Sequence, residues 1–170
     1  MSISESPKLF PVSWDQFHRD ARALAWRLAD LGPFDGLIAV TRGGLVPAAI
    51  VARELGLRVI ETVSVTSYTG DADVPETERG EVRIVKPLAA TFLDARGAKL
   101  LVVDDLVDTG GTARVLRELL PHAHLATVYA KPAGRPLVDT FVTEVSQDTW
   151  INFPWDLGLV FQPPIAQGAD

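Results

Sequence analysis

Residues 99–112 read KLLVVDDLVDTGGT, and this run is the most informative stretch of the chain. Its apolar part, residues 100–103, is continuous, which predicts a strand that is buried on both faces of a parallel sheet. Asp104 and Asp105 follow at the carboxyl end of that strand, where open α/β sheets bind their ligands. Because neighbouring strand residues point to opposite faces, we expect the two carboxylates to have different roles.

The second half of the run predicts an anion site. Gly110 and Gly111 allow a sharp turn, and Thr112 is expected to be the N-cap of a helix over residues 113–120, whose N-terminus adds partial positive charge. Carboxylates repel phosphate, however, and Asp108 adds a third one here. A divalent cation, or a sugar whose hydroxyls donate to the acids, would reconcile these features, and a phosphorylated ribose with Mg²⁺ supplies both. The run lacks the Gly-Lys-Ser/Thr of a P-loop and the spaced glycines of a dinucleotide fingerprint.

A second strand–glycine–helix unit precedes this one. Residues 36–40 predict a buried strand, Arg42 and two glycines follow, and a helix is expected from about residue 47 to residue 55. A guanidinium beside exposed backbone amides suits a second anion. A surface arginine next to an ordinary turn is the alternative interpretation.

The whole pattern predicts one domain, residues 1–170, of the α/β class: a mainly parallel twisted sheet flanked by helices. A capping box at residues 13–16 begins the first helix, and Trp14 and Trp26 are expected to pack in the core or at an interface. The polar segment 69–80 is too long for a hairpin turn and is expected to be a surface insertion or a flexible lid loop.

The composition excludes several classes of protein. A formal net charge of −6 and the absence of a basic stripe argue against nucleic acid as a partner. Without cysteine there is no disulfide or thiol chemistry. The first residues do not have the layout of a signal peptide, and no apolar run approaches membrane-spanning length, so we expect a cytoplasmic protein.

The run at 99–112 resembles the ribose-phosphate motif of the type I phosphoribosyltransferases. Its VDDLVDTGGT part is especially similar to the bacterial members that act on xanthine and guanine. The resemblance extends to RGGLVP at 42–47, AKPAGRPLVD at 130–139, QDTWI at 147–151 and PWD at 154–156. It implies a small purine-binding hood over about residues 140–165, and it implies that the loop 69–80 closes over the bound donor.

The activity implied by this resemblance is a purine-salvage transfer. The 5-phosphoribosyl group of 5-phosphoribosyl-1-pyrophosphate would pass to guanine, xanthine or hypoxanthine, giving GMP, XMP or IMP and pyrophosphate, with Mg²⁺ as cofactor. The resemblance also implies a homodimer or homotetramer, and peripheral membrane association is known for similar proteins.

Residue roles follow from the same resemblance. All three acids are expected to be catalytic. Asp105 is expected on the metal side, and Asp104 nearer the ribose or supporting the loop. Asp108 would face the base and accept or manage its imidazole-ring proton as the new bond forms. The residues expected to bind the donor are Arg42, Gly43, Arg79, Asp104, Asp105, Leu106, Val107, Asp108, Thr109, Gly110, Gly111 and Thr112.

The purine is expected to contact Asp108 and four residues further along the chain. Lys131 would donate to the 6-oxo group, and Trp150 would stack on the base. Ile151 would offer backbone groups near the 2-position, and Asp156 would complete that edge or hold the hood.

Two other functions are weighed against the enzyme. A non-catalytic, nucleotide-sensing regulator would keep the ribose-phosphate motif, because fold does not fix function. A phosphatase with an aspartyl nucleophile commonly uses two aspartates with one residue between them, whereas Asp104 and Asp105 are adjacent and Asp108 lies three residues further on.

Overall fold

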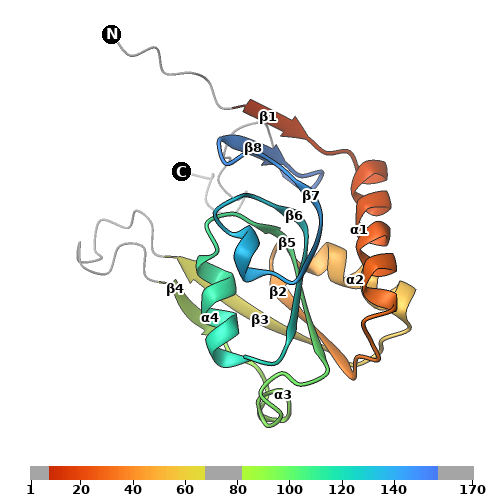
Figure 1. The fold of residues 1–170 in the computed structure, drawn as a ribbon, viewed down its shortest axis with the longest axis vertical. Helices are drawn as coiled ribbons and strands as arrows, with labels where there is room; N and C mark the ends of the chain where they lie inside the picture. The colour runs from red at the N-terminus through yellow and green to blue at the C-terminus, as the bar shows by residue number, and fades with distance from the viewer. Residues whose placement is uncertain (1–7, 68–81, 157–170) are drawn as a thin grey trace, which may run out of the picture.

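The computed structural model describes residues 8–67 and 82–156. Six strands form one sheet with the order β4-β3-β2-β5-β6-β7 (Figure 1). All neighbouring pairs are parallel except β3 and β4, so the mainly parallel α/β sheet predicted from sequence is confirmed. The strands are β2 (Gly36–Thr41), β3 (Ile60–Ser67), β4 (Val82–Lys86), β5 (Leu100–Val107), β6 (His124–Ala130) and β7 (Thr140–Glu144).

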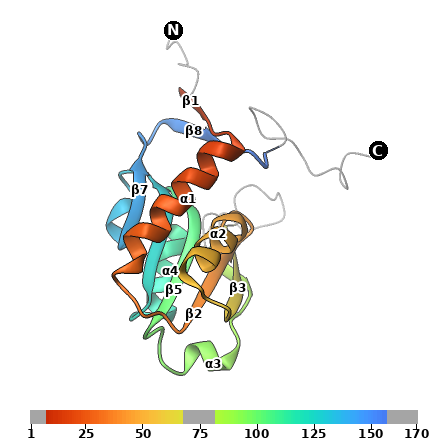
Figure 2. The ribbon, with the colours of Figure 1, turned by 90° about the vertical axis from the view of Figure 1, so that its right-hand side faces the viewer.

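Helices cover both faces of this sheet. α1 (Trp14–Ala29) and α2 (Leu45–Leu55) pack on one face, and α4 (Gly111–Leu119) packs on the other (Figure 2). A short helix, α3 (Ala90–Leu93), and a 3-10 turn, η2 (Arg135–Leu137), lie in the connections. Each face therefore has its own hydrophobic core, and the carboxyl ends of the strands are left as the open edge.

The first helix begins as its capping box predicts, because the Ser13 hydroxyl accepts a hydrogen bond of 3.1 Å from the Gln16 N–H. Its apolar face is buried from Phe17 to Leu28. Trp14 and Trp26 do not share that face: they are 54% and 73% exposed. Of the two placements expected for these tryptophans, the core is therefore wrong, and the interface stays a prediction.

The central unit differs from its prediction at two boundaries. β5 continues to Val107, so both acids lie within the strand, where Asp104 pairs with Thr127 of β6. α4 begins at Gly111 with Gly110 as its N-cap, so Thr112 lies in the first turn, and the expectation that it caps the helix is wrong. Gly110 takes over this position because its left-handed backbone, φ +88°, makes the turn.

A second, small sheet joins the two ends of the described chain. β1 (Lys8–Pro11) pairs in parallel with β8 (Thr149–Asn152), above the carboxyl edge of the main sheet (Figure 1). β7 belongs to the main sheet, whereas residues 157–165 of the expected hood and the loop 69–80 lie outside the described residues. Within the described ranges, no helix is both long and apolar enough to cross a membrane.

Candidate functional site

Two glycine-containing loops meet at the carboxyl edge of the sheet, because β2 and β5 are neighbouring parallel strands. A Cβ on Gly44 would lie 2.5 Å from the carbonyl oxygens of Val40 and Val103, one on each strand. A Cβ on Gly43 would overlap the Asp105 carboxylate. Only glycine permits approaches this close, so the loop after β2 and the acids of β5 form a single site.

The two acids of β5 face different surroundings, as the alternation of strand side chains predicts. Asp105 lies against Gly43. Asp104 lines a cavity of about 180 Å³ on the α4 side of the sheet, and its Oδ1 accepts a hydrogen bond of 2.9 Å from the Asp105 N–H. Thr127 lines the same cavity, and its buried hydroxyl has no hydrogen-bond partner among the described residues.

Both acids are made harder to ionise by their surroundings. Desolvation raises the pKa of Asp104 well above its usual range, and the charge of Asp105 raises it further. Desolvation also raises the pKa of Asp105, to about 6. A cation or hydroxyl donors would favour the charged forms, so this pair is suited to a polyhydroxylated ligand, a divalent cation, or both.

Asp105 fits one mode of magnesium binding. Among residues 8–67 and 82–156, no three His, Cys, Asp or Glu side chains gather into a group that could hold a metal ion. Mg²⁺ in proteins is usually held by only one or two carboxylates, with waters and substrate phosphates as its other ligands. A desolvated carboxylate between the loops after β2 and β5 meets that requirement, so Asp105 would be the protein ligand.

The loop after β5 forms the N-terminus of α4. Gly110 is required twice here, because its φ is positive and a Cβ would overlap the Leu137 side chain. No side chain caps α4, so the N–H groups of its first turn are available to an anion. The cavity beneath is lined by the expected donor-binding residues Leu106, Val107, Asp108, Thr109, Gly110, Gly111 and Thr112, together with Asp104.

The loop after β2 has the same form with a different charge. The Thr41–Arg42 peptide bond is cis, and Gly44 begins α2 without a side-chain cap. The Arg42 side chain is exposed and forms no ion pair with any other residue that the structure describes. A free guanidinium beside uncapped amides can bind a second anion.

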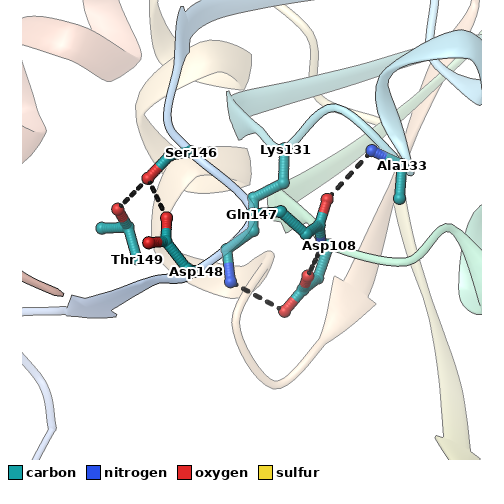
Figure 3. A network of polar contacts seen from close by, with 7 residues as sticks. All are labelled: Asp108, Lys131, Ala133, Ser146, Gln147, Asp148 and Thr149. Carbon is teal, nitrogen blue, oxygen red and sulfur yellow. Dashed lines mark hydrogen bonds and ion pairs between the residues drawn. The ribbon is translucent and has the colours of Figure 1, made fainter. Parts of the chain in front are cut away.

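The side chain of Asp108 is held at both of its oxygens (Figure 3). The buried Lys131, which directly follows β6, places its Nζ 3.0 Å from Asp108 Oδ2. The structure thus brings together the lysine and the aspartate that the sequence assigns to the purine. A donor and an acceptor side by side would match a base that has an oxo group next to a ring N–H.

Gln147 contacts the other oxygen, and the sequence interpretation assigned it no role. Its Nε2 donates to Asp108 Oδ1 at 2.7 Å, and its Oε1 accepts from the Ala133 N–H at 3.0 Å. The only signal in the sequence was its place at the head of the QDTWI run.

The small β1–β8 sheet carries the other expected purine residues. Trp150 is 48% exposed, so its ring is available for stacking, whereas the side chain of Ile151 is buried. Asp156 Oδ2 accepts a hydrogen bond of 2.8 Å from the Phe153 N–H, which fixes the turn after β8. Of the two roles expected for Asp156, the geometry therefore supports holding the hood. Arg79 lies outside the described residues.

Two uncapped helix N-termini thus lie beside a pair of acids at the carboxyl edge of this α/β sheet, an arrangement suited to a phosphorylated sugar. The phosphoribosyl transferase domain model matches residues 13–162, which is most of the chain. The protein therefore belongs to the phosphoribosyltransferase family, as its resemblance to the type I members implies.

Solved structures support the same family. A purine phosphoribosyltransferase from Pyrococcus horikoshii Ot3 is 29% identical with a TM-score of 0.74, and the match covers 91% of this chain and 99% of that one. A hypothetical protein from Neisseria gonorrhoeae with bound ppGpp is 28% identical with a TM-score of 0.69, over 89% and 91% of the two chains. The Helicobacter pylori xanthine-guanine-hypoxanthine phosphoribosyltransferase, at 20% identity and a TM-score of 0.64 over 88% and 94%, shares the fold.

Proposed function

We propose that this protein transfers the 5-phosphoribosyl group of 5-phosphoribosyl-1-pyrophosphate to guanine or xanthine, with hypoxanthine as a third candidate. The observation that carries the proposal is the Asp108–Lys131 pair, whose charged atoms lie 3.0 Å apart beside an uncapped helix N-terminus. Lys131 would donate to the 6-oxo group while Asp108 accepts the neighbouring ring N–H.

The reaction exchanges one bond at the anomeric carbon for another. The N9 atom of the base bonds to C1 of the ribose as the bond from C1 to the pyrophosphate oxygen breaks, and pyrophosphate leaves with the electron pair. As the bond to N9 forms, the base loses the proton on N7 of its imidazole ring, which lies on the same edge as the 6-oxo group, and Asp108 accepts that proton. Asp104 and Asp105 accept hydrogen bonds from the ribose hydroxyls and stabilise positive charge that develops on the sugar, as in glycoside chemistry.

The remaining residues hold the reactants. The 5′-phosphate would lie at the N-terminus of α4, against residues 109–112, and the pyrophosphate would lie against Arg42 and Gly43, with Arg79 as a further contact. Mg²⁺ bound at Asp105 would offset the negative charge of the leaving group.

The base itself would lie under the small sheet. Trp150 would stack on it, main-chain groups of Ile151 would contact its 2-position, and Asp156 would keep the turn of the hood in place.

The comparisons favour a purine as the acceptor. The Pyrococcus horikoshii protein, which is called a purine phosphoribosyltransferase, matches this chain over nearly its whole length. The choice among the three oxopurines depends on which groups face the 2-position. An acceptor there favours the amine of guanine, and a donor there favours the second oxo group of xanthine.

A nucleotide-sensing regulator is the second candidate. The Neisseria gonorrhoeae protein, at 28% identity, has ppGpp bound. Such a ligand could use the same uncapped helix N-termini without any bond being made or broken. Turnover separates the two functions, because a regulator binds nucleotide but makes no monophosphate.

The test is to incubate the protein with MgCl₂, 5-phosphoribosyl-1-pyrophosphate and each oxopurine separately, and to detect the monophosphate by mass. Base-dependent product supports the enzyme and ranks its substrates. Binding of guanine nucleotides by calorimetry with no product from any base supports the regulator instead. Sedimentation velocity on the same sample tests the homodimer or homotetramer that the family resemblance implies.

A further inference from the structure

The amide of Gln147 can be oriented in only one way. The Ala133 main-chain N–H can only donate, so the oxygen of the Gln147 amide must face it, at 3.0 Å. The nitrogen of that amide then faces Asp108 Oδ1, at 2.7 Å (Figure 3). The Ala133 N–H therefore fixes the positions of the amide oxygen and nitrogen of Gln147, and the group that contacts Asp108 is the nitrogen, a donor.

The carboxylate of Asp108 needs such a partner to keep one orientation. Its side chain is half exposed, and the torsion about the bond to a carboxyl group is broad. Lys131 holds Oδ2 from the end of β6, and Gln147 holds Oδ1 from the segment between β7 and β8. Donors from two separate elements, one at each oxygen, fix the plane of the carboxylate.

The segment that carries Gln147 makes further polar contacts. The Ser146 hydroxyl donates to Asp148 Oδ1 at 2.6 Å, and Lys8 of β1 pairs with Asp148 at 2.9 Å (Figure 3 shows the first contact). β8, with Trp150, follows directly. The same short segment therefore leads into the expected stacking face and holds the carboxylate below it.

We infer that Gln147 is a positioning residue for phosphoribosyl transfer: it holds the Asp108 carboxylate in the orientation that accepts the ring proton of the base. This inference rests on the proposed function, in which Asp108 is the proton acceptor. Gln147 does not itself touch the reacting atoms. Its effect should appear when the proton moves, and therefore in kcat more than in the binding of either substrate.

Two substitutions separate this role from a purely structural one. Gln147→Glu keeps an oxygen for the Ala133 N–H and nearly the same shape, but it places a second carboxylate against Asp108 in place of the donor. Gln147→Met keeps the length and loses both hydrogen bonds. Gln16→Glu, in the first turn of α1, is the matched control for the added charge.

Steady-state kinetics with the donor, MgCl₂ and the best oxopurine should show a loss in kcat of about 10- to 100-fold for Gln147→Glu, the range for removing a hydrogen bond to a charged group. KM should change little for either substrate, and the melting temperature should stay close to that of wild type. If Gln147 only anchored Ala133, Gln147→Glu would have the kcat and KM of wild type. Gln147→Met would then mainly raise KM for the base. That pair of results would overturn the inference.

A double-mutant cycle gives the second test. In an Asp108→Asn background, Gln147→Glu should lower kcat no further, because the residue that it positions no longer accepts the proton. Additive losses would show that Gln147 acts by another route and would refute the inference. If Gln147→Glu does not fold, an unchanged kcat in folded Gln147→Met refutes it equally. A wild-type protein without base-dependent turnover refutes the proposed function, whereas an active wild type with unchanged Gln147 variants refutes this inference alone.

Discussion

The loop after β2 and the loop after β5 have the same construction and opposite chemistry. Each follows a parallel strand, contains two adjacent glycines and leads into a helix without a side-chain cap. The first carries an exposed cation, Arg42. The second carries three carboxylates, of which Asp104 and Asp105 have pKa values raised by desolvation.

The glycines of the two loops also have different functions. Gly44 has an ordinary helical φ of −72° but no room for a side chain between β2 and β5. Gly110 has a positive φ that turns the chain into α4. The same two-glycine pattern therefore serves close approach in one loop and backbone conformation in the other. The charge beside the glycines also differs, and the proposed ligands follow it: pyrophosphate at the first loop and the phosphorylated ribose at the second.

The largest effect should come from the acid that only the second loop has. Asp108→Asn keeps the shape of the side chain and removes the proton acceptor, so we expect kcat to fall by about 10²- to 10⁴-fold, the usual contribution of general acid–base catalysis. Initial rates of monophosphate formation measure this. Asp94→Asn, an exposed change after α3, is the control and should leave the rate unchanged. A variant that kept wild-type kcat would remove Asp108 from the mechanism.

Gly44→Ala tests the close approach of the two loops. The atoms that a Cβ would meet are backbone carbonyl oxygens, which cannot move aside, so we expect a loss of unfolding free energy of about 3 kcal/mol, the upper end for overpacking. Gly56→Ala, where φ is +69° and no atom lies within 4 Å of the added Cβ, should cost only about 1 kcal/mol through backbone strain. Urea denaturation of both variants measures the difference. Equal losses would mean that the loops are less tightly packed than the structure shows.

Asp105→Asn tests the carboxylate that joins the loops. Its pKa rises from an ordinary value of 3.8 to about 6 on folding, so the folded state binds the proton more tightly, and stability falls as pH rises from about 4 to about 6. The variant should lose that part of the pH dependence and gain up to about 3 kcal/mol at pH 7. Denaturation between pH 4 and pH 8 in metal-free buffer measures it. A less stable variant at pH 7 would show that the carboxylate is stabilised by a partner rather than desolvated.

The arrangement of elements followed from the sequence because each buried strand is a continuous apolar run and each helix has a start or stop residue. Of the two boundaries that were wrong, the start of α4 depends on the local backbone of Gly110, and the end of β5 depends on a distant partner. β5 passes through its acids because β6 continues to pair beside it, up to Ala130 opposite Val107. Trp14 and Trp26 were expected in the core or at an interface; they are not in the core, because the buried stripe of α1 is already filled by other residues.

The candidate site could be predicted where its residues lie in one continuous run. Asp104 through Thr112 are such a run, and the structure places all of them except Asp105 around one cavity beside a helix N-terminus, with Asp105 against Gly43 of the neighbouring loop. Lys131 could be placed near them because strands that alternate with helices bring their carboxyl ends to one edge. Gln147 could not, since its contact with Asp108 joins residues 39 apart in the chain through a segment without periodicity.

Arg42→Ala should have the smallest effect and gives the sharpest distinction between the loops. The guanidinium is exposed, so its removal should raise KM for 5-phosphoribosyl-1-pyrophosphate by about 10-fold, as expected for one charge-assisted contact, and leave KM for the base unchanged. Arg42→Lys keeps the charge without the bidentate geometry, so its KM for the donor should lie between those of wild type and Arg42→Ala. Initial rates over a range of donor concentrations measure this. If KM for the donor does not change, the anion at the first loop is bound by backbone amides alone, and the two loops then differ in their acids rather than in having charges of opposite sign.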